Sequence, residues 1–485
     1  MNAKGNLFRI WLLGAVLLLP ITLQAQFTFT TNNGTITITG LTNSPTGALV
    51  IPDTINGLPV TSLGRGAFES NEALTSISFG SNLTNIGQTA LLGCTGLTNL
   101  TIPDNIVSIG KAAFQSCSNL ANVTLGTNIT SIEDNTFQYC TRLAAVSIPN
   151  MVARIGDSAF FDCTNLSSVT IPDSVTNIGN ATFFQCLCLT NVVIPNRVFS
   201  LGNEAFAYCT YLTNILLDTN LTSIGVSAFA YCRNLPNLLI PQNVIYIGGG
   251  AFVYCTNLNL TVDPQNTIYT SPSGVLFDKS LNTLVEYPTG KPGGYEVPDG
   301  TVNIADSAFA DCIGLTSVTI PNSTTNMGVY AFLNCHSLTN VTIGNQLATI
   351  GHEAFNGCIN LTRISFMGNA PSNSTDVAVF FNDYYVTVYY LPDTTGWGSV
   401  FDGAPTAPWL PRAESAGFGN GASTNQFGFS FNWASGRTVV VEASTNLSNP
   451  NWQPMQTNAL TTGSADFSDP QWSNYVRRFY RLRSL

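Results

Sequence analysis

The chain of 485 residues contains 12 cysteines but only 2 histidines, so thiols dominate the side chains that could do chemistry. Eleven of the cysteines are separated by steps of 23 residues, with one step of 57. They are Cys94, Cys117, Cys140, Cys163, Cys186, Cys209, Cys232, Cys255, Cys312, Cys335 and Cys358. Thiols at such a spacing could form disulfides, hold a metal ion or act as nucleophiles.

The neighbours of these cysteines favour a structural role instead. Each one lies three residues after a position that is usually Phe and three before a Leu, which predicts a buried ladder of reduced thiols. Disulfides between adjacent repeats remain open, because an exported protein meets oxidising conditions. Cys188 is out of register and is expected to be more exposed, but Cys186-x-Cys188 has no histidine beside it. No metal ion or other cofactor is therefore expected.

Other catalytic patterns are equally sparse. His336 and His352 fall at variable loop positions outside any known catalytic motif. Glu133-Asp134 is the only adjacent acidic pair in the array and replaces a turn glycine, so it reads as solvated turn charge. The three glycines at 248–250 lack the Lys-Ser/Thr of a phosphate-binding loop. No catalytic residue is assigned, and a protein that is not an enzyme is expected.

The cysteine spacing belongs to a longer repeat that must position every other side chain. Apolar residues recur in each unit, as in Leu166, Val169, Ile171, Val175, Ile178, Phe183 and Cys186. A fixed period in this range is typical of a solenoid, in which each repeat forms one coil stacked on the next. Alternation over 169–171 predicts one short strand per coil, pairing in parallel with its neighbours, and the following stretch suggests a turn with a helical or 3₁₀ segment.

The full unit, Leu-x-x-Val-x-Ile-Pro-x-x-Val-x-x-Ile-Gly-x-x-Ala-Phe-x-x-Cys, resembles the BspA-type leucine-rich repeat of bacterial surface proteins over about residues 27–410. The resemblance implies an α/β-type solenoid of 23-residue coils with parallel strands, and a role in extracellular binding or adhesion. Two departures stand out. Leu91 replaces the Phe, and residues 259–300 interrupt the period as an enlarged repeat that carries a hairpin.

The amino terminus has the pattern of a secretory signal peptide. Lys4 and Arg9 precede the apolar stretch 10–19, and Leu23-Gln24-Ala25 supplies a cleavage site. The pattern predicts that residues 1–25 are removed and that the protein is exported, to be extracellular or at the cell surface. No later stretch is apolar for long enough to span a membrane in the mature chain.

The predicted order of parts follows from where the repeat begins and ends. It comprises a signal peptide (1–25), an amino-terminal cap (26–60), leucine-rich repeats (61–370) with the enlarged repeat (259–300), a carboxy-terminal cap and linker (371–412) and a small all-β, sandwich-like domain (413–485). The last domain ends in a group of arginines that suits either surface attachment or a structural plug: Arg477, Arg478, Arg481 and Arg483.

A candidate binding surface emerges where the strand position between the two inward residues changes character. In eight coils that outward residue carries a hydroxyl: Ser78, Thr101, Thr124, Ser147, Thr170, Thr319, Thr342 and Ser365. In three successive coils it is Val193, Leu216 and Leu239, which predicts an exposed apolar strip. The same three coils place Tyr208, Tyr231 and Tyr254 immediately before their cysteines. Either the hairpin of the enlarged repeat covers this strip, or a partner binds there.

The composition limits the kind of partner. Only 9% of residues are charged, with 17 Lys and Arg against 27 Asp and Glu and no basic run, which argues against nucleic acid. A protein or extracellular matrix ligand is the first expectation. A glycan is the alternative, because aromatic side chains that could stack on sugars include the tyrosines named above together with Tyr384, Tyr385, Tyr389, Tyr390 and Trp397.

Overall fold

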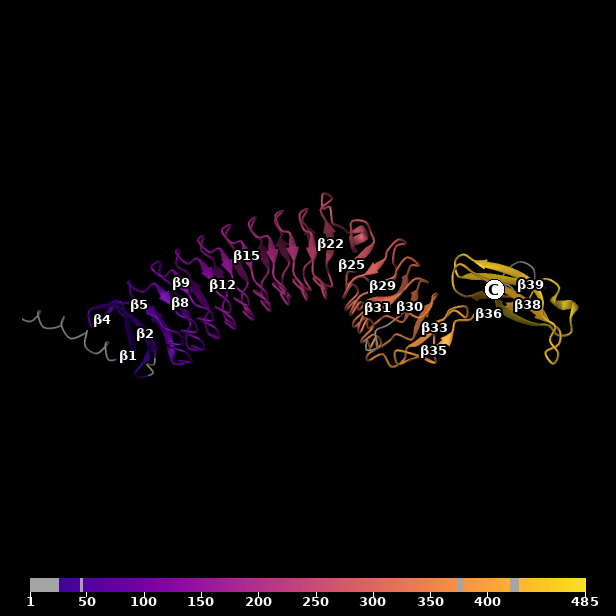
Figure 1. Cartoon of the computed structure of the whole chain (residues 1–485), viewed down its shortest axis with the longest axis horizontal. Helices are drawn as coiled ribbons and strands as arrows, with labels where there is room; N and C mark the ends of the chain where they lie inside the picture. The colour runs from indigo at the N-terminus through magenta and orange to yellow at the C-terminus, as the bar shows by residue number, and fades with distance from the viewer. Residues whose placement is uncertain (1–25, 44–46, 373–377, 419–426) are drawn as a thin grey trace, which may run out of the picture. The chain divides into compact units, whose positions relative to one another are not determined.

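The computed structural model describes residues 26–43, 47–372, 378–418 and 427–485; the predicted signal peptide lies outside the described residues. The chain divides into two compact units, of which the first comprises Met1–Lys291 with Ala305–Cys312 and the second Pro292–Ile304 with Ile313–Leu485. Both contain coils that stack on one another (Figure 1).

Each regular coil of the first unit contributes two short strands rather than the single strand predicted from the sequence. The first strands are β8 (Asn99–Thr101), β10 (Asn122–Thr124), β12 (Ala145–Ser147), β14 (Ser168–Thr170), β16 (Asn191–Val193), β18 (Asn214–Leu216), β20 (Asn237–Ile240) and β22 (Asn259–Val262). The second strands are β11 (Ser131–Ile132), β13 (Arg154–Ile155), β15 (Asn177–Ile178), β17 (Ser200–Leu201), β19 (Ser223–Ile224) and β21 (Tyr246–Ile247). Strands of each kind pair in parallel, generally residue i with residue i+23, as in Val192 with Ile215. β20 and β22 pair at a spacing of 22, as in Leu238 with Leu260.

The amino-terminal strands begin this stack. They are β1 (Phe27–Asn32), β2 (Thr35–Leu41), β3 (Gly47–Val50), β4 (Thr54–Ile55), β5 (Leu58–Leu63), β6 (Leu74–Ser78), β7 (Asn85–Ile86) and β9 (Ser108–Ile109). β1 pairs antiparallel with β2, and β2 then pairs in parallel with β5. The first coils therefore build on strands that are already paired.

The enlarged repeat departs from this plan after β22. It contains β23 (Tyr269–Thr270), the 3₁₀ turn η1 (Pro272–Gly274), β24 (Leu276–Asp278) and β25 (Thr283–Glu286). β24 pairs antiparallel with both β23 and β25, so this segment does contain a hairpin.

The second unit resumes the coils and ends in antiparallel sheets. Its repeat strands are β26 (Gly293–Glu296), β27 (Asn303–Ile304), β28 (Leu315–Ile320), β29 (Asn326–Met327), β30 (Asn340–Ile343), β31 (Thr349–Ile350), β32 (Arg363–Phe366), β33 (Thr387–Tyr390), β34 (Val400–Phe401) and β35 (Ala404–Pro408). The terminal part contains β36 (Arg412–Phe418), β37 (Phe427–Asn432), β38 (Arg437–Ser444), β39 (Gln453–Leu460), β40 (Ser464–Asp469), η2 (Trp472–Asn474) and β41 (Phe479–Ser484). These form two three-stranded antiparallel sheets, β36-β37-β40 and β39-β38-β41, in the sandwich-like arrangement predicted for this part.

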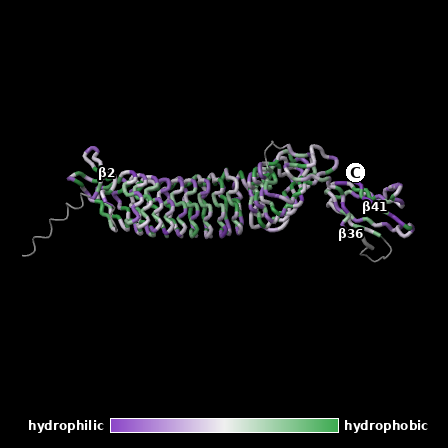
Figure 2. The backbone as a smooth tube through the Cα atoms, turned by 90° about the horizontal axis from the view of Figure 1, so that it is seen from below, coloured by the Kyte–Doolittle hydropathy of each residue, from purple (hydrophilic) through white to green (hydrophobic). Residues whose placement is uncertain are grey.

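The core is a set of identical side chains stacked along the array. Phe114, Phe137, Phe160, Phe183, Phe206, Phe229 and Phe252 stack in sequence, with ring centroids 5.2–5.9 Å apart. Hydrophobic segments of successive coils line up along the tube (Figure 2). The thiols align as well: Cys209 Sγ donates to the Phe183 carbonyl oxygen at 3.2 Å and Cys232 Sγ to that of Phe206 at 3.2 Å. Each thiol thus ties its coil to the preceding one.

The α/β assignment was wrong, because the described residues contain no α-helix and only two 3₁₀ turns. The stretch expected to be helical is a chain of turns. In one coil Ala181 and Gln185 have φ angles of 49° and 58°, in the left-handed region that breaks an α-helix. Their N–H groups bond across to the next coil, Ala181 to Asn203 and Gln185 to Ala207. Hydrogen bonding between coils replaces hydrogen bonding within a helix, and the fold is a parallel β-solenoid.

Candidate functional site

The apolar strip of Val193, Leu216 and Leu239 lies on the outward face of three successive coils. The exposed fractions of these side chains are 59%, 56% and 53%. They face outward because the residues beside them, such as Ile215 at 4% exposure, point into the core. Val193 is paired directly with Leu216 across β16 and β18. Leu239 is paired with Thr261 on its other side, so the strip ends there in a hydroxyl.

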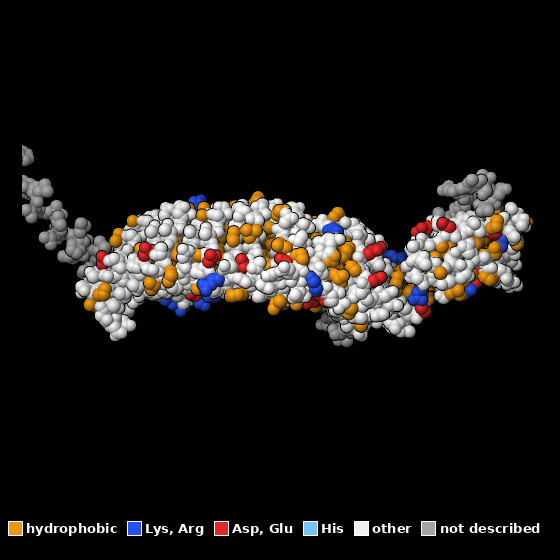
Figure 3. Space-filling view, turned by 90° about the horizontal axis from the view of Figure 1, so that it is seen from above, with side chains coloured by type: hydrophobic (Ala, Val, Ile, Leu, Met, Phe, Trp, Pro, Cys, Tyr) orange, Lys and Arg blue, Asp and Glu red, His pale blue; other side chains and the backbone are white. Residues whose placement is uncertain are grey.

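The hairpin of the enlarged repeat does not cover the strip. All three side chains remain more than half exposed. The hairpin instead follows the column of second strands: the Tyr269 hydroxyl of β23 accepts a hydrogen bond from the Ile247 N–H of β21 at 3.1 Å. The alternative in which the enlarged repeat shields the strip is therefore wrong. The face of the molecule that Figure 3 shows from above carries few charged side chains along the array.

The tyrosine column of Tyr208, Tyr231 and Tyr254 is a continuous stack. The ring centroids of Tyr208 and Tyr231 are 4.1 Å apart with the planes 9° from parallel, and those of Tyr231 and Tyr254 are 4.2 Å apart at 22°. All three residues have positive φ, between 59° and 63°. This backbone is unfavourable for a bulky side chain, but the Tyr208 and Tyr231 N–H groups bond to carbonyls of the following coil. The stack is therefore held by the backbone beneath it.

Polar contacts fix the hydroxyl groups of the column. Hydrogen bonds join Tyr231 to Tyr208 and Tyr254, and Tyr254 to Asp311. Asp311 is only 4% exposed. Burial and hydrogen bonding to Tyr208 raise the pKa of Tyr231 to about 12, and burial and the Asp311 carboxylate also raise the pKa of Tyr254. The guanidinium carbon of Arg233 lies 5.6 Å from the Tyr231 ring and 5.9 Å from the Tyr254 ring. The stacking of the three rings leaves their edges, rather than their faces, for a partner.

The stack extends further than the sequence interpretation found. The ring centroid of Phe184 lies 5.2 Å from that of Tyr208, and that of Phe161 lies 4.7 Å from that of Phe184. The ring centroid of Tyr139 then lies 5.6 Å from that of Phe161. The signal was available, since Phe161 and Phe184 are also 23 residues apart, but they precede their cysteines by two positions instead of one. The contribution of Asp311, which lies beyond the enlarged repeat, carried no local signal.

The other candidates for chemistry are structural. The repeat thiols are free and buried, and burial raises the pKa of the Cys140 thiol well above its usual range. Cys188 alone is partly exposed. Asp134 forms ion pairs with Lys111 and Arg154, each at 2.7 Å. No group of three or more His, Cys, Asp or Glu side chains suited to a metal ion occurs among the residues described.

The aromatic cluster proposed for glycan stacking does not form one surface. Tyr384 and Tyr385 are 82% and 74% exposed, whereas Trp397 packs against Tyr390 at 5.5 Å and against Phe366 at 4.9 Å. Within the stretch predicted as the carboxy-terminal cap, the only strand over 378–391 is β33. Phe380 stacks on Phe355 at 5.8 Å, which identifies this stretch as one more coil.

Three of the four terminal arginines form ion pairs with carboxylates of the terminal sheets. Glu442 accepts hydrogen bonds from the Nε groups of Arg481 and Arg483, both at 2.7 Å. Arg478 pairs at 2.8 Å with Asp469, whose side chain is fully buried, and the Tyr480 hydroxyl donates to the same carboxylate at 2.8 Å. These contacts favour a structural role over an exposed basic patch.

Comparison with known proteins places these features in a family. The model of the BspA type leucine rich repeat region matches in six copies, over residues 61–189, 130–259, 176–285 and 294–396. No curated protein matches the chain. Among solved structures, a leucine rich cell surface protein from Faecalibacterium prausnitzii is 28% identical, with 75% of this chain and 86% of that chain covered and a TM-score of 0.52.

Two further solved structures are similar in sequence or coverage. A leucine rich repeat protein of T. pallidum is 28% identical, covering 45% of this chain and 90% of its own, with a TM-score of 0.34. A leucine-rich repeat protein from Bacteroides ovatus is 19% identical, covering 79% of this chain and 98% of its own, with a TM-score of 0.40.

Within the described part of the chain, no helix has the length and hydrophobicity needed to cross a bilayer.

Proposed function

The chain belongs to the BspA-type leucine-rich repeat family, and from this premise we propose that it is an exported binding protein, without enzymatic activity, that engages a protein partner at the cell surface. The family and fold are those of non-enzymatic repeat proteins, and its relatives suggest a role in binding or adhesion. Export rests on the sequence of residues 1–25 and on the likeness to a cell surface protein.

The observation that carries this proposal is the exposure of the apolar strip. Leaving three aliphatic side chains more than half exposed, where most other coils place Ser or Thr, forfeits the favourable burial of hydrocarbon. Contiguous apolar surface of this kind commonly marks an interface. The coil geometry supports a protein partner, because the backbone fixes Val193 and Leu216 side by side before any partner arrives.

The tyrosine column favours a protein over a glycan in the same region. Its ring faces are occupied by neighbouring rings at 4.1 and 4.2 Å, so a sugar cannot stack between them. What remains is a set of ordered aromatic edges beside a cationic group, Arg233. Tyr and Arg are among the residues that are enriched at protein interfaces.

A capture experiment tests the proposal. Protein comprising residues 26–485 would be immobilised and exposed to intact surface proteins, and the captured partner would be purified for affinity measurement. Replacing Leu216 and Leu239 by Ser should weaken that affinity at least roughly tenfold, the effect of losing about 1.4 kcal/mol. Ile245→Ser is the matched control, because Ile245 is 62% exposed but lies outside the strip. Equal affinity of the strip variant and the control would refute the strip as the binding surface.

A further inference from the structure

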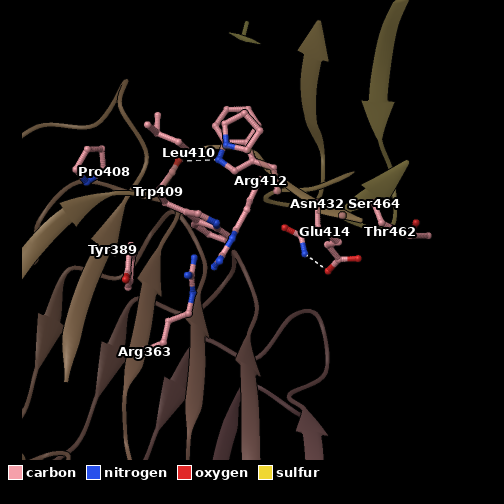
Figure 4. A pocket seen from close by; sticks show the side chains of 13 residues that line it. Arg363, Tyr389, Pro408, Trp409, Leu410, Arg412, Glu414, Asn432, Thr462 and Ser464 are labelled. Atoms are coloured by element: carbon pink, nitrogen blue, oxygen red, sulfur yellow. Dashed lines mark hydrogen bonds between the residues drawn. The ribbon is translucent and has the colours of Figure 1, made fainter. Parts of the chain in front are cut away.

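A pocket of about 800 Å³ belongs to the second unit and differs in chemistry from the apolar strip of the first unit. Its walls come from the last repeat strands and from the terminal sheets (Figure 4). Two contacts connect these walls: the Trp433 Nε1–H donates to the Trp409 carbonyl oxygen at 2.7 Å, and Arg437 pairs with Asp393 at 2.8 Å. Leu391 also belongs to the apolar core of the terminal sheets.

Two arginines converge on this pocket. Arg363 rises from β32 and Arg412 from the start of β36, and their guanidinium groups point toward one another (Figure 4). Neither forms an ion pair with any described residue, whereas Arg437, Arg478, Arg481 and Arg483 in the same unit are all paired. Two like charges that line one pocket, neither of them in an ion pair, are unfavourable, and burial and Arg412 together lower the pKa of Arg363. An anion between them would remove this repulsion.

The position of Arg363 is fixed before a ligand binds. Its guanidinium carbon lies 4.1 Å from the Tyr389 ring and 5.4 Å from the Trp409 ring. Its Nε–H donates to the Ser365 hydroxyl at 2.9 Å, which leaves the terminal nitrogens of the group for a ligand. A planar guanidinium held in this way matches the geometry of a carboxylate.

The remaining polar groups suit a ligand rich in hydroxyls. Glu414 and Asn432, which are hydrogen-bonded to each other, line the pocket together with Thr462 and Ser464. Because Glu414 adds a carboxylate to the wall of the pocket, a polyanion with charge on every side is disfavoured. The same carboxylate favours a ligand that presents one carboxylate to the arginines and neutral hydroxyls to Glu414. A sugar acid has this distribution of groups.

We propose that the pocket between β32–β35 and the terminal sheets binds a carboxylate-bearing sugar of an acidic polysaccharide. Arg363 and Arg412 bind its carboxylate, and Glu414, Asn432, Thr462 and Ser464 bind its hydroxyl groups. This site is independent of the protein-binding strip, so failure of either proposal leaves the other standing. It would give the protein a second attachment, to the glycan matrix around a cell.

Isothermal titration of the protein comprising residues 26–485 tests the proposal with defined probes at low salt. The probes are oligogalacturonate, hyaluronan oligomers and oligosialic acid, with methyl-esterified oligogalacturonate as the neutral counterpart and oligoglutamate as an acidic polymer without a sugar. We expect at least one carboxylated glycan to bind, and both the ester and oligoglutamate to bind at least about tenfold more weakly. Absence of binding by all three glycans, or equal binding of either comparison polymer, would overturn it.

Variants locate the site. Arg412→Gln removes an exposed charge with no structural partner among the described residues, so the fold should persist while affinity falls roughly tenfold or more. Arg363→Gln should lower affinity to a similar extent. Arg142→Gln, which changes an exposed arginine in the first unit, is the matched control and should bind like the unchanged protein. Unchanged affinity in Arg412→Gln, or an equal loss in Arg142→Gln, would place the ligand elsewhere.

Discussion

Replacing Phe206 by Ala is the substitution that most directly perturbs the stacked core. Phe206 is fully buried, and its ring lies 5.2 Å from that of Phe183 and 5.6 Å from that of Phe229. Truncation of a buried Phe costs about 3–5 kcal/mol through lost burial and the cavity that remains. The loss should fall near the top of that range, because two aromatic contacts are removed at once.

The location of the loss is as informative as its size. Each coil contacts only its neighbours, so instability should stay within the coils around residue 206. Hydrogen exchange measured peptide by peptide during guanidinium unfolding should show early opening of about residues 180–235, followed by the flanking coils. Val193→Ala is the control, since that side chain is 59% exposed and its truncation should cost under about 0.5 kcal/mol. Uniform loss of protection along the whole array would refute the nearest-neighbour account.

Three further predictions concern packing and ionisation. Gly202→Ala should destabilise its coil, because an added Cβ would lie 2.4 Å from the backbone of Gly179. In the control, Gly57→Ala, the Cβ would have no heavy atom within 4 Å, so that variant should cost only the strain of its positive φ. Thermal unfolding compares the two variants. Burial raises the pKa of Glu286 from its ordinary 4.5 to about 8, so the folded state holds a proton that the unfolded state releases. The local free energy of unfolding should therefore fall by up to roughly 4–5 kcal/mol as pH rises from about 4.5 to 8. In hydrogen exchange, Glu286→Gln should abolish that dependence on pH. A small maleimide applied to the native protein should modify Cys188 and spare the buried repeat thiols, as mass spectrometry of peptides would show; rapid modification of Cys209 would contradict the buried ladder.

Periodicity made most of the repeat array predictable. The spacing of Phe183, Phe206 and Cys209 specified which side chains face inward, and the outward position between two core residues identified Val193, Leu216 and Leu239 as exposed. A regular pattern of burial needs no knowledge of distant contacts, because every coil repeats the environment of the previous one.

The same periodicity could not specify the backbone between strands. Apolar spacing over Ala181 to Cys186 suits a helix or a set of turns equally well, and the choice was made by N–H groups that bond to the next coil. A single coil, read alone, contains no information about that partner. The helical expectation therefore failed at the point where hydrogen bonding between coils outweighs local propensity.

Contacts between parts that are distant in sequence were also beyond reach. Asp311 meets Tyr254 only because the enlarged repeat returns the chain to the column. Arg363 and Arg412 are separated by 49 positions and share no motif, so nothing in the sequence indicates that both line one pocket. The buried Glu286 shows a related effect, since it occupies the place before the core aromatic where most coils have Ala.

Photo-crosslinking from the apolar strip tests the central claim most directly. A photoreactive amino acid would replace Leu216, and, in a matched protein, Thr170, which occupies the same outward position in a coil with a hydroxyl. On intact cell surfaces, the account predicts a discrete crosslinked protein from position 216 that is lost when Val193 and Leu239 are changed to Ser, and little product from position 170. Equal crosslinking from both positions, or product at 216 that survives those changes, would contradict it.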